Sequence, residues 1–499
     1  MSKAKRLAAL LLSGLLLIGP AGCHKEPQKP EGSSGATTAA TAGSGTDASA
    51  DTDASGEATG GADTSTTSKP GIIRPAGTTK GQTTKKAGTT APPKPIEIKE
   101  DVQNAKFKNL KGTLNIVTSQ SNPYEPQIIA EYEAKYGVKV EQKVMGWASF
   151  QSQLASMVQA GNPPDVASMT DATSLNWCYG NLAQPLNKYL DLKSPTWNLD
   201  DMSQFKIGTN YYGIPLYEYN GFMIYYNKAL FKAQKQPDPY TEYYLKGNWT
   251  FETFRKVAKA MTIVEGGTVK TQGFATWYFP VFVLASGGNI LKEQNRTYVS
   301  DLQNPATARG MNFLRDLYMD GSFDYRVRGF TEFGNGKAAM VAERPQNLIG
   351  DHDYYASMKD NIGVVPFPKM DKNSKAYAPA LMTANFVPNK ARNPLAGVAW
   401  IYYNHRRAID GEANGNASVL EQRRRSVSDE HKKIFDDYFK SAVKITTKLE
   451  GLTGWSDELR GQFWGEILTE SPSNSKPAEE AIAGMENIIK THLKLTVGG

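Results

Sequence analysis

The sequence predicts an α/β fold with more than one folded unit, preceded by a signal peptide and a disordered linker. Three observations carry this prediction. The chain has 499 residues, which exceeds one compact domain. Its first hundred residues have the composition of a leader and a tether. The remaining stretch of about 390 residues alternates short strands with amphipathic helices, as α/β folds do.

Composition excludes several classes of protein. Lys and Arg total 57 and Asp and Glu total 50, so the net charge is only +7, and no concentrated basic stripe marks a nucleic-acid partner. The two cysteines, Cys23 and Cys178, are too few for the common zinc sites. No two of the five histidines stand three to five residues apart. We therefore expect no catalytic residue, no metal and no cofactor.

The N-terminus reads as a secretion signal. Lys3, Lys5 and Arg6 precede an apolar run over 7–18, which is too short to span a membrane and suits the core of a signal peptide. Ala21-Gly22-Cys23 follows and resembles a bacterial lipobox. The prediction is a lipoprotein signal peptide over 1–22 and lipidation, including palmitate, at Cys23. The alternative is an ordinary cleaved signal with an incidental cysteine.

Residues 23–105 are predicted to be a disordered tether. Ala, Thr, Ser, Gly and Pro dominate, and such a segment cannot bury enough apolar surface to fold. Its acidic residues come mainly first and its basic residues later. The tether is either simply solvated, or its basic half contacts an anionic cell-wall polymer or lipid. Together these features predict a folded part on the extracellular face of the cell membrane, held there by lipid.

Within 106–499 the elements follow in a doubly wound order. Asp165 is predicted to cap the turn after the break at 162–164. The first lobe is predicted to contain a strand over 113–117, a helix ended by Gly137, a strand over 138–144, a helix ended by Gly161, and a strand over 165–169. The second is predicted to contain a strand over 222–226, a helix capped by Thr250, a helix opened by Asn304-Pro305, strands over 338–341 and 362–365, and helices over 458–468 and 477–493.

Several ordered blocks of sequence resemble the family 1 extracellular solute-binding proteins of bacterial ABC importers, the family that includes maltose-binding protein. The blocks are GVKV at 137–140, GNPPDV at 161–166, YGIP at 212–215, YYNKALF at 225–231, NWTFETF at 248–254, GKAAM at 336–340 and GVVPFP at 363–368. Each block is short, and their order over about 390 residues carries the resemblance.

The resemblance implies a periplasmic-binding-protein-like fold whose two lobes close on a solute in the cleft between them. It places lobe 1 at about 106–217 plus part of 380–450. Lobe 2 takes about 221–375 plus part of the C-terminal helices. The implied function is the membrane-anchored solute-binding component of an ABC importer. The implied partners are the permease subunits and a small-molecule solute, on a monomeric chain without nucleic acid.

Aromatic rings beside carboxylates and amides suit a carbohydrate, which presents apolar C–H faces and rings of hydroxyls. Loops after the first two strands offer such groups, and the resemblance adds residues after the third strand, at the hinge, in an aromatic segment and in the late helices. The predicted ligand-binding residues are Ser119, Gln120, Trp147, Asp171, Glu218, Trp277, Tyr278, Trp455 and Trp464.

Other interpretations remain open. Each tryptophan could instead pack in a core, and Trp177 and Trp249 are assigned to structure. The solute could be a peptide or another polar molecule. A secreted glycan-active enzyme would need two carboxylates at a set separation, and the sequence carries no common hydrolase or nucleotide-binding motif. A structural lipoprotein is a further alternative.

Overall fold

The computed structural model describes residues 97–98, 104–119, 124–194, 196–197, 199–216, 220–327, 329–345, 358–413, 428–469 and 471–497. The chain divides into two units, 1–86 and 87–499, and everything below concerns the second. The signal peptide, Cys23, Gln120, Glu218 and all of the tether before residue 97 lie outside the described residues.

Lobe 1 is built on a mixed sheet that begins as the sequence predicts. Strand β1 (Thr113–Ser119) pairs in parallel with β2 (Lys139–Met145). A bridge from Ile116 to Val166 extends β1 toward β3 (Ala167–Thr170). Strand β15 (Thr383–Phe386) then lies antiparallel between β3 and β6 (Ile214–Pro215). The order is therefore β2-β1-β3-β15-β6, with one strand supplied from far along the chain.

Helices cover this sheet, and their ends follow local sequence. Helix α2 ends as predicted at Gly137, whose positive φ of 67° suits glycine. Helix α3 ends at Gln159, two residues before the predicted stop at Gly161, which also has positive φ. The helices of lobe 1 are α2 (Pro126–Tyr136), α3 (Trp147–Gln159), α4 (Ser174–Tyr179), α5 (Leu199–Met202) and α12 (Pro394–Ala413), with short 3-10 turns at Asn104–Phe107, Leu186–Lys188 and Ser203–Phe205. A hairpin joins β4 (Lys206–Ile207) to β5 (Asn210–Tyr211).

Asp165 does not cap a turn, so that prediction was wrong. Its carboxylate accepts hydrogen bonds from the backbone N–H groups of Asn115 at 2.9 Å and Asn393 at 2.6 Å. The side chain is 1% exposed. It therefore joins β1 to the segment that leads into α12, two parts of lobe 1 that are far apart in sequence.

Lobe 2 contains the second sheet, in the order β13-β7-β12-β9-β8. Its strands are β7 (Met223–Asn227), β8 (Ile263–Glu265), β9 (Thr268–Ala275), β12 (Ala338–Glu343) and β13 (Ile362–Val365). The central strand β12 runs parallel to β9 and antiparallel to β7, and all six of its residues are buried. A continuous apolar strand of this kind is typical of a sheet covered on both faces.

The predicted helix caps of lobe 2 are confirmed. The Thr250 side chain accepts a hydrogen bond from the Thr253 N–H, and Asn304 accepts one from the Ala306 N–H. The helical segments of this lobe are α6 (Lys228–Ala233), η5 (Pro239–Tyr244), α7 (Phe251–Ala260), α8 (Val281–Ala285), α9 (Pro305–Met319), α10 (Gly329–Gly334), α14 (Asp429–Ser441), α15 (Asp457–Gly465) and α16 (Ala478–Val497), with short turns at Lys359–Asn361, Leu449–Gly451 and Pro472–Asn474. The hairpin β10 (Leu291–Gln294) and β11 (Thr297–Ser300) completes it.

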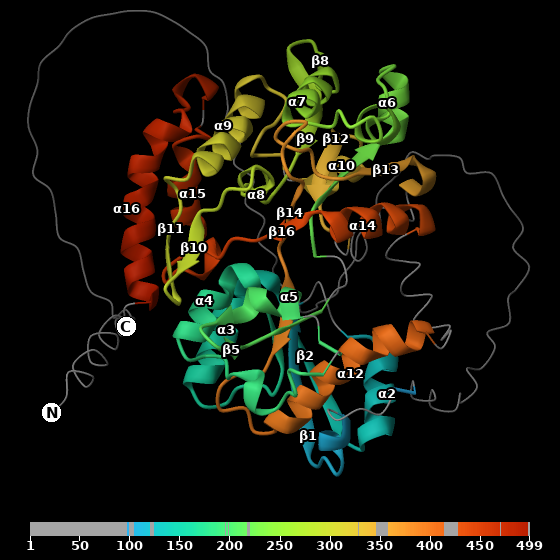
Figure 1. Cartoon of the computed structure of the whole chain (residues 1–499), viewed down its shortest axis with the longest axis vertical. Coiled ribbons are helices and arrows are strands. Elements are labelled where there is room, and N and C mark those ends of the chain that lie inside the picture. Colours follow the sequence, from blue (N-terminus) through green and yellow to red (C-terminus); the bar gives the residue numbers. More distant parts are fainter. Residues whose placement is uncertain are drawn as a thin grey trace, which may run out of the picture. The chain divides into compact units, whose positions relative to one another are not determined.

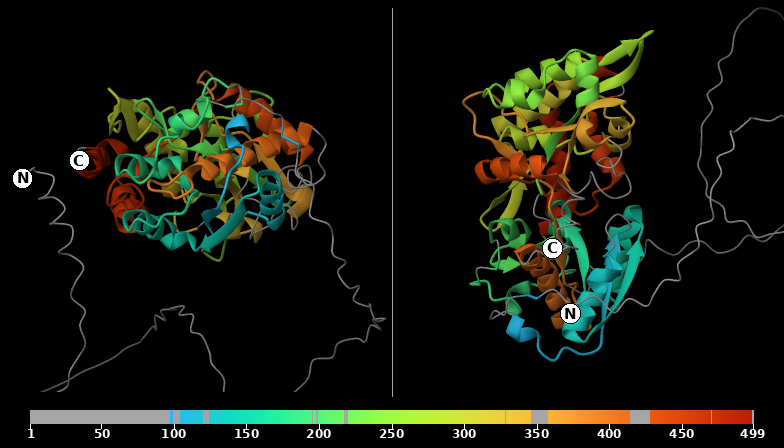
Figure 2. Two further views of the ribbon diagram at one scale, coloured as in Figure 1. Left: turned by 90° about the horizontal axis from the view of Figure 1, so that it is seen from below. Right: turned by 90° about the vertical axis from the view of Figure 1, so that its right-hand side faces the viewer.

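Three short extended segments lie at the boundary between the lobes, and we call them the hinge strands: 220–222, 379–381 and β16 (Val443–Ile445) (Figure 1). The Phe222 N–H donates to Pro379 O at 2.7 Å, and the Ala380 N–H donates to Ile445 O at 2.9 Å. Strand β14 (Tyr377–Pro379) pairs in parallel with β16. The right-hand view of Figure 2 shows the blue-to-cyan elements of lobe 1 below the green-to-yellow elements of lobe 2.

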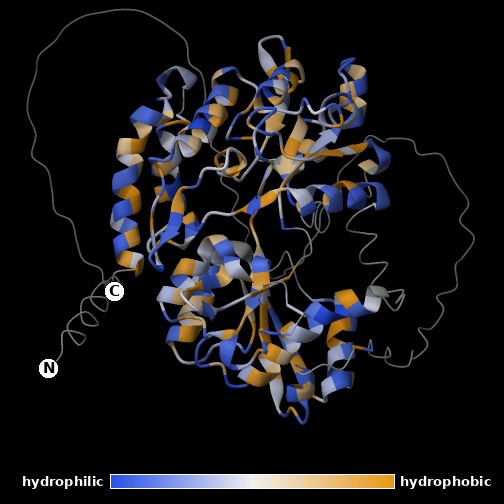
Figure 3. Ribbon diagram, in the orientation of Figure 1, coloured by the Kyte–Doolittle hydropathy of each residue, from blue (hydrophilic) through white to orange (hydrophobic). Residues whose placement is uncertain are grey.

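The apolar interior comprises three clusters, and the largest, in lobe 2, also includes Ala172 and Leu175 of lobe 1. Lobe 1 is filled by two clusters, one around Tyr132 and Trp400 and one around Phe150 and Trp177. Lobe 2 has one large cluster that includes α14 to α16, and α16 carries apolar residues along its length (Figure 3). Among the described residues no helix has both the length and the apolarity to cross a membrane.

Candidate functional site

The carboxyl ends of the parallel strands of each lobe carry most of the predicted site residues. In lobe 1, β1 ends at Ser119, and β3 runs directly into Asp171, the first residue of the turn η2 (Asp171–Thr173). Helix α3 begins at Trp147, two residues beyond the end of β2. Because these strands are parallel, their ends share one edge of the sheet, where ligands bind in open α/β sheets.

In lobe 2, β9 and β12 are parallel and end close together. Trp277 follows the end of β9 and Arg344 follows the end of β12. The Trp277 indole Nε1 donates to Glu343 Oε2 at 2.7 Å, and the Arg344 backbone N–H donates to Glu343 Oε1 at 2.8 Å. The Arg344 guanidinium carbon lies 6.0 Å from the centre of the Trp277 ring. Glu343 therefore fixes the orientation of the predicted ligand-binding tryptophan.

Asp171 is fully buried where the two lobes meet. Its backbone N–H donates to Met382 O at 2.9 Å, and its Oδ1 accepts from the Met382 N–H at 2.7 Å. Its Oδ2 is buried with no hydrogen-bond partner among the described residues. Burial raises the pKa of the Asp171 carboxyl, and the nearby Lys448 ammonium opposes this rise. The carboxylate thus has one oxygen held and one left to accept.

The hinge connects Asp171 to the lobe 2 residues. Arg344 Nη1 donates to Leu381 O at 2.7 Å, and Leu381 is the residue before Met382. Two strand ends, one from each lobe, are therefore bonded to consecutive residues of one hinge segment. A rotation at that segment would change how Asp171 and Arg344 lie relative to each other.

Tyr278 completes the lobe 2 side. Its ring stacks on Phe222, with the ring centres 5.1 Å apart and the planes 2° apart. Its hydroxyl is buried without a hydrogen-bond partner among the described residues. Burial raises the pKa of Tyr278, and the carboxylates of Asp171 and Glu450 raise it further.

Lys448 and Glu450 add opposite charges beside Asp171. Lys448 is 6% exposed, and its Nζ donates to Gln204 O and, at 3.5 Å, to Asp171 O. Burial lowers the pKa of Lys448, whereas it raises that of Glu450, which lies in the turn η8 (Leu449–Gly451). We call Asp171, Trp277, Tyr278, Arg344, Lys448 and Glu450 the interlobe cluster.

The structure places the other predicted residues differently. Trp464 is 3% exposed and packs edge-on against Phe279 and Phe463, inside the core of lobe 2. Trp455 is half-buried, and its Nε1 has no hydrogen-bond partner among the described residues. Ser119 is buried at the end of β1. Thus the structure pairs Trp277 with Tyr278, links them to Asp171 only through Arg344 and the segment 381–382, and leaves Trp464 within the apolar core.

Sequence reasoning missed Arg344, Lys448 and Glu450. A signal existed for Arg344, because Glu343-Arg344 is a charged pair directly after an apolar strand. No comparable signal marks Lys448 or Glu450, which lie in the connection between β16 and α15. Only the path of that connection past Asp171 brings them into the site.

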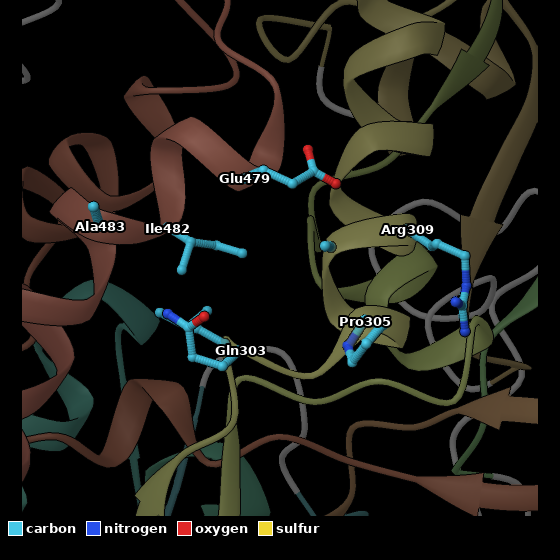
Figure 4. A pocket seen from close by; sticks show the side chains of 8 residues that line it. Gln303, Pro305, Arg309, Glu479, Ile482 and Ala483 are labelled. Carbon is cyan, nitrogen blue, oxygen red and sulfur yellow. The ribbon is translucent and has the colours of Figure 1, made fainter.

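A hollow of about 500 Å³ lies elsewhere, on the surface of lobe 2 between α9 and α16 (Figure 4). Its lining residues are Leu302, Gln303, Pro305, Ala308, Arg309, Glu479, Ile482 and Ala483. None of them is a predicted site residue or a member of the interlobe cluster. In the described part of the chain, no group of three or more His, Cys, Asp or Glu side chains could hold a metal ion.

Solved structures of ABC transporter binding proteins share this fold. The substrate-binding protein Lmo0181 of Listeria monocytogenes, in complex with cycloalternan, superposes with a TM-score of 0.60 at 16% identity, over 76% of this chain and 99% of that one. The GacH receptor of Streptomyces glaucescens, studied with acarbose, gives 0.57 at 18%, over 77% and 99%.

UgpB of Mycobacterium tuberculosis, in complex with glycerophosphocholine, gives a TM-score of 0.59 at 16% identity, over 78% of this chain and 99% of that one. At such identities the likeness shows the fold alone, and it confirms the predicted α/β periplasmic-binding-protein-like architecture. No curated protein sequence matches the chain.

The sequence profile of the bacterial extracellular solute-binding proteins matches residues 127–405, which is more than half of the 499 residues. The match runs from α2 of lobe 1 through lobe 2 to α12, so it includes the strand ends that carry Asp171, Trp277 and Arg344. The chain therefore belongs to the bacterial extracellular solute-binding protein family.

Proposed function

We propose that this protein is the solute-binding component of an ABC importer, and that it captures a mono- or oligosaccharide at the interlobe cluster. The observation that supports this most is that the lobe 1 strand end with buried Asp171 and the lobe 2 strand end with Arg344, beside Trp277, are hydrogen-bonded to the consecutive residues Met382 and Leu381. Aromatic faces pack on the apolar C–H faces of a sugar, while carboxylates accept from its hydroxyls.

The unused hydrogen-bonding capacity of the cluster supports a hydroxyl-rich solute. Asp171 Oδ2, the Tyr278 hydroxyl and the Thr447 hydroxyl are buried without a hydrogen-bond partner among the described residues. Leaving such groups unpaired costs roughly 1–3 kcal/mol each. A sugar hydroxyl both donates and accepts, so one ligand could satisfy a carboxylate and a phenol together.

The remaining predicted residues belong to this proposal as further candidates, either at the site or as support for it. They are Ser119, Gln120, Trp147, Glu218, Trp455 and Trp464. Ser119 and Trp147 lie at the same sheet edge as Asp171, which supports a role for them. Trp464 packs against Phe279, next to Tyr278, so its contribution would be to hold the 277–279 segment.

The structural relatives support a carbohydrate without deciding it. Their bound molecules include cycloalternan, mannobiose and maltotetraose, but also glycerophosphocholine. A small polar solute of another class is therefore the second outcome that an experiment has to distinguish. An enzymatic role is not proposed, since the family is one of solute-binding proteins.

Calorimetric titration of the purified chain with maltotetraose, mannobiose and glycerophosphocholine tests the proposal. We expect saturable binding of at least one saccharide with no product formed on prolonged incubation. Binding of glycerophosphocholine together with failure of every saccharide in a wider glycan panel would contradict the carbohydrate assignment. It would leave the solute-binding function intact.

We also propose that Cys23 is lipidated and anchors the extracellular chain to the membrane through the tether. The lipobox-like Ala21-Gly22-Cys23 after an apolar run supports this. Two acyl chains are enough for stable attachment. Labelled palmitate should enter the wild-type protein, and Cys23→Ser should release it from the membrane fraction. Membrane attachment that survives the substitution would contradict the anchor.

A further inference from the structure

The segment 443–448 belongs to lobe 2 by its backbone. Strand β16 pairs with β14, and the Val443 N–H donates to Ala376 O at 2.9 Å. The Thr446 carbonyl accepts from Asn289 Nδ2 at 2.7 Å, and Asn289 follows α8 of lobe 2. The main chain over 443–446 is thus bonded to lobe 2, whereas the turn η8, which follows Lys448, packs against Ala172 and Leu175 of lobe 1.

The side chains at alternate positions of the same segment contact lobe 1 instead. Lys444 forms an ion pair with Asp201 at 2.5 Å, and Thr446 Oγ1 donates to Gln204 Oε1 at 2.8 Å. Lys448 Nζ donates to Gln204 O and Asp171 O. Alternate side chains of an extended segment point the same way. A period-two row of Lys, Thr and Lys therefore faces α5 and the turns η4 (Ser203–Phe205) and η2 of lobe 1.

These contacts are shielded from solvent, so they are stronger than ordinary surface pairs. Lys444 and Asp201 have side-chain exposures of 27% and 12%, and Lys448 is 6% exposed. Exposed ion pairs contribute little, whereas removing one partner of a buried pair is costly. Since the backbone of Lys444 and Thr446 is bonded to lobe 2 and their side-chain partners belong to lobe 1, moving these parts of the lobes away from each other would break the two side-chain contacts.

We propose that Lys444, Thr446 and Lys448 form an interlobe latch that favours the closed arrangement before any solute binds, and that positions Asp171 against the hinge. A ligand that binds only the closed form has an apparent affinity equal to its intrinsic affinity multiplied by the fraction of molecules that are closed. Lys444 and Thr446, which are outside the interlobe cluster, would therefore raise affinity without contacting the solute. This inference depends on the two-lobe fold and not on the identity of the solute.

The test measures the distance between lobes in solute-free protein. The full chain with Cys23→Ser carries spin labels at Glu141→Cys on lobe 1 and Lys256→Cys on lobe 2, both exposed positions, while Cys178 is buried. Lys444→Met/Thr446→Val removes two members of the row with little change in side-chain volume. We expect the ratio of long to short interlobe distances to rise on the order of tenfold, as loss of one to two kcal/mol of coupling implies.

Lys476→Met is the matched control, because Lys476 forms an exposed ion pair with Glu466 inside lobe 2. It should leave the distance distribution unchanged. Thermal unfolding of each variant checks that the lobes remain folded. Lys448→Met removes a buried cation, so its distances are compared with those of the double variant only if its thermal midpoint shows that it is folded. A folded double variant whose distances equal those of wild type and control would overturn the latch. Absence of sugar binding would not affect this result.

Discussion

Asp165 and Asp171 stand on either side of β3, and both side chains are almost completely buried, yet their carboxylates have different partners. Both Asp165 oxygens accept from backbone N–H groups within lobe 1. Asp171 has only one oxygen held in this way, and the other faces no partner among the described residues. The first pattern is that of a structural residue, and the second leaves an oxygen that could accept a hydrogen bond from a bound solute.

Asp165→Asn and Asp171→Asn should therefore separate stability from binding. Asp165→Asn converts an acceptor of two backbone bonds into an amide, and we expect a loss of about 1–3 kcal/mol in the free energy of unfolding. Asp171→Asn should weaken saccharide binding by roughly 10 to 100-fold, as loss of a hydrogen bond to a charged group implies. Denaturant unfolding and calorimetry measure the two effects. Weaker binding with unchanged stability in Asp165→Asn, or lower stability with unchanged binding in Asp171→Asn, would contradict this interpretation.

Trp455 and Trp464 offer a second contrast between residues of the same type. Trp464→Ala should lower the free energy of unfolding by about 3–5 kcal/mol, because it opens a cavity between Phe279 and Phe463. Trp455→Phe keeps a ring and removes the unpaired Nε1 donor, so we expect unchanged stability and up to about tenfold weaker binding. Equal affinity of Trp455→Phe and wild type would indicate that Trp455 packs in the fold and does not bind the solute.

At the scale of elements, caps and strand patterns were read correctly because they depend on neighbouring residues. Thr250, Asn304 and Gly137 act within one turn of where they stand in the sequence. Asp165 was misread for the complementary reason. Its partner Asn393 is 228 residues away, and no local pattern reports such a contact.

Helix α14 carries a buried histidine whose titration affects stability. Burial lowers the pKa of His431 to about 4 from its ordinary 6.5, with the charge of Lys228 lowering it further against the opposing effect of Glu430. The folded chain thus holds His431 neutral, while the unfolded chain protonates near 6.5. As pH falls from 6.5 toward 4, the unfolded state gains the proton first, so stability decreases by at most about 3 kcal/mol.

His431→Gln should remove this part of the acid sensitivity. Unfolding free energies measured at pH 7, 6, 5 and 4 should decline less steeply in the variant than in wild type. The hydrogen bond between His492 Nδ1 and the Thr453 carbonyl is exposed, so the variant His492→Gln serves as the comparison. An equal slope for wild type and His431→Gln between pH 6.5 and 4 would contradict the assignment.

For the whole molecule, a solute bound between two lobes should raise the free energy of unfolding of both lobes together. A ligand that binds only the folded, closed chain stabilises it by about 2.7 kcal/mol at one hundred times its dissociation constant. We therefore expect the whole 87–499 unit to unfold in one transition, measured by circular dichroism, and a saccharide to raise the midpoint of that transition. Stabilisation of one lobe alone, seen as a second transition that does not shift, would argue against a site between the lobes.

The sequence by itself determined the α/β class and the order of many strands and helices, because periodicity and caps are local. Asp171, Trp277 and Tyr278 were predicted as ligand-binding residues from a family resemblance, and that prediction remains to be tested. Only the tertiary structure decided that Arg344, Lys448 and Glu450 join them, that Trp464 is in a core, and that β15 lies inside the sheet of lobe 1. The physical reason is that these facts depend on contacts between segments tens to hundreds of residues apart, which the hinge crossings bring together.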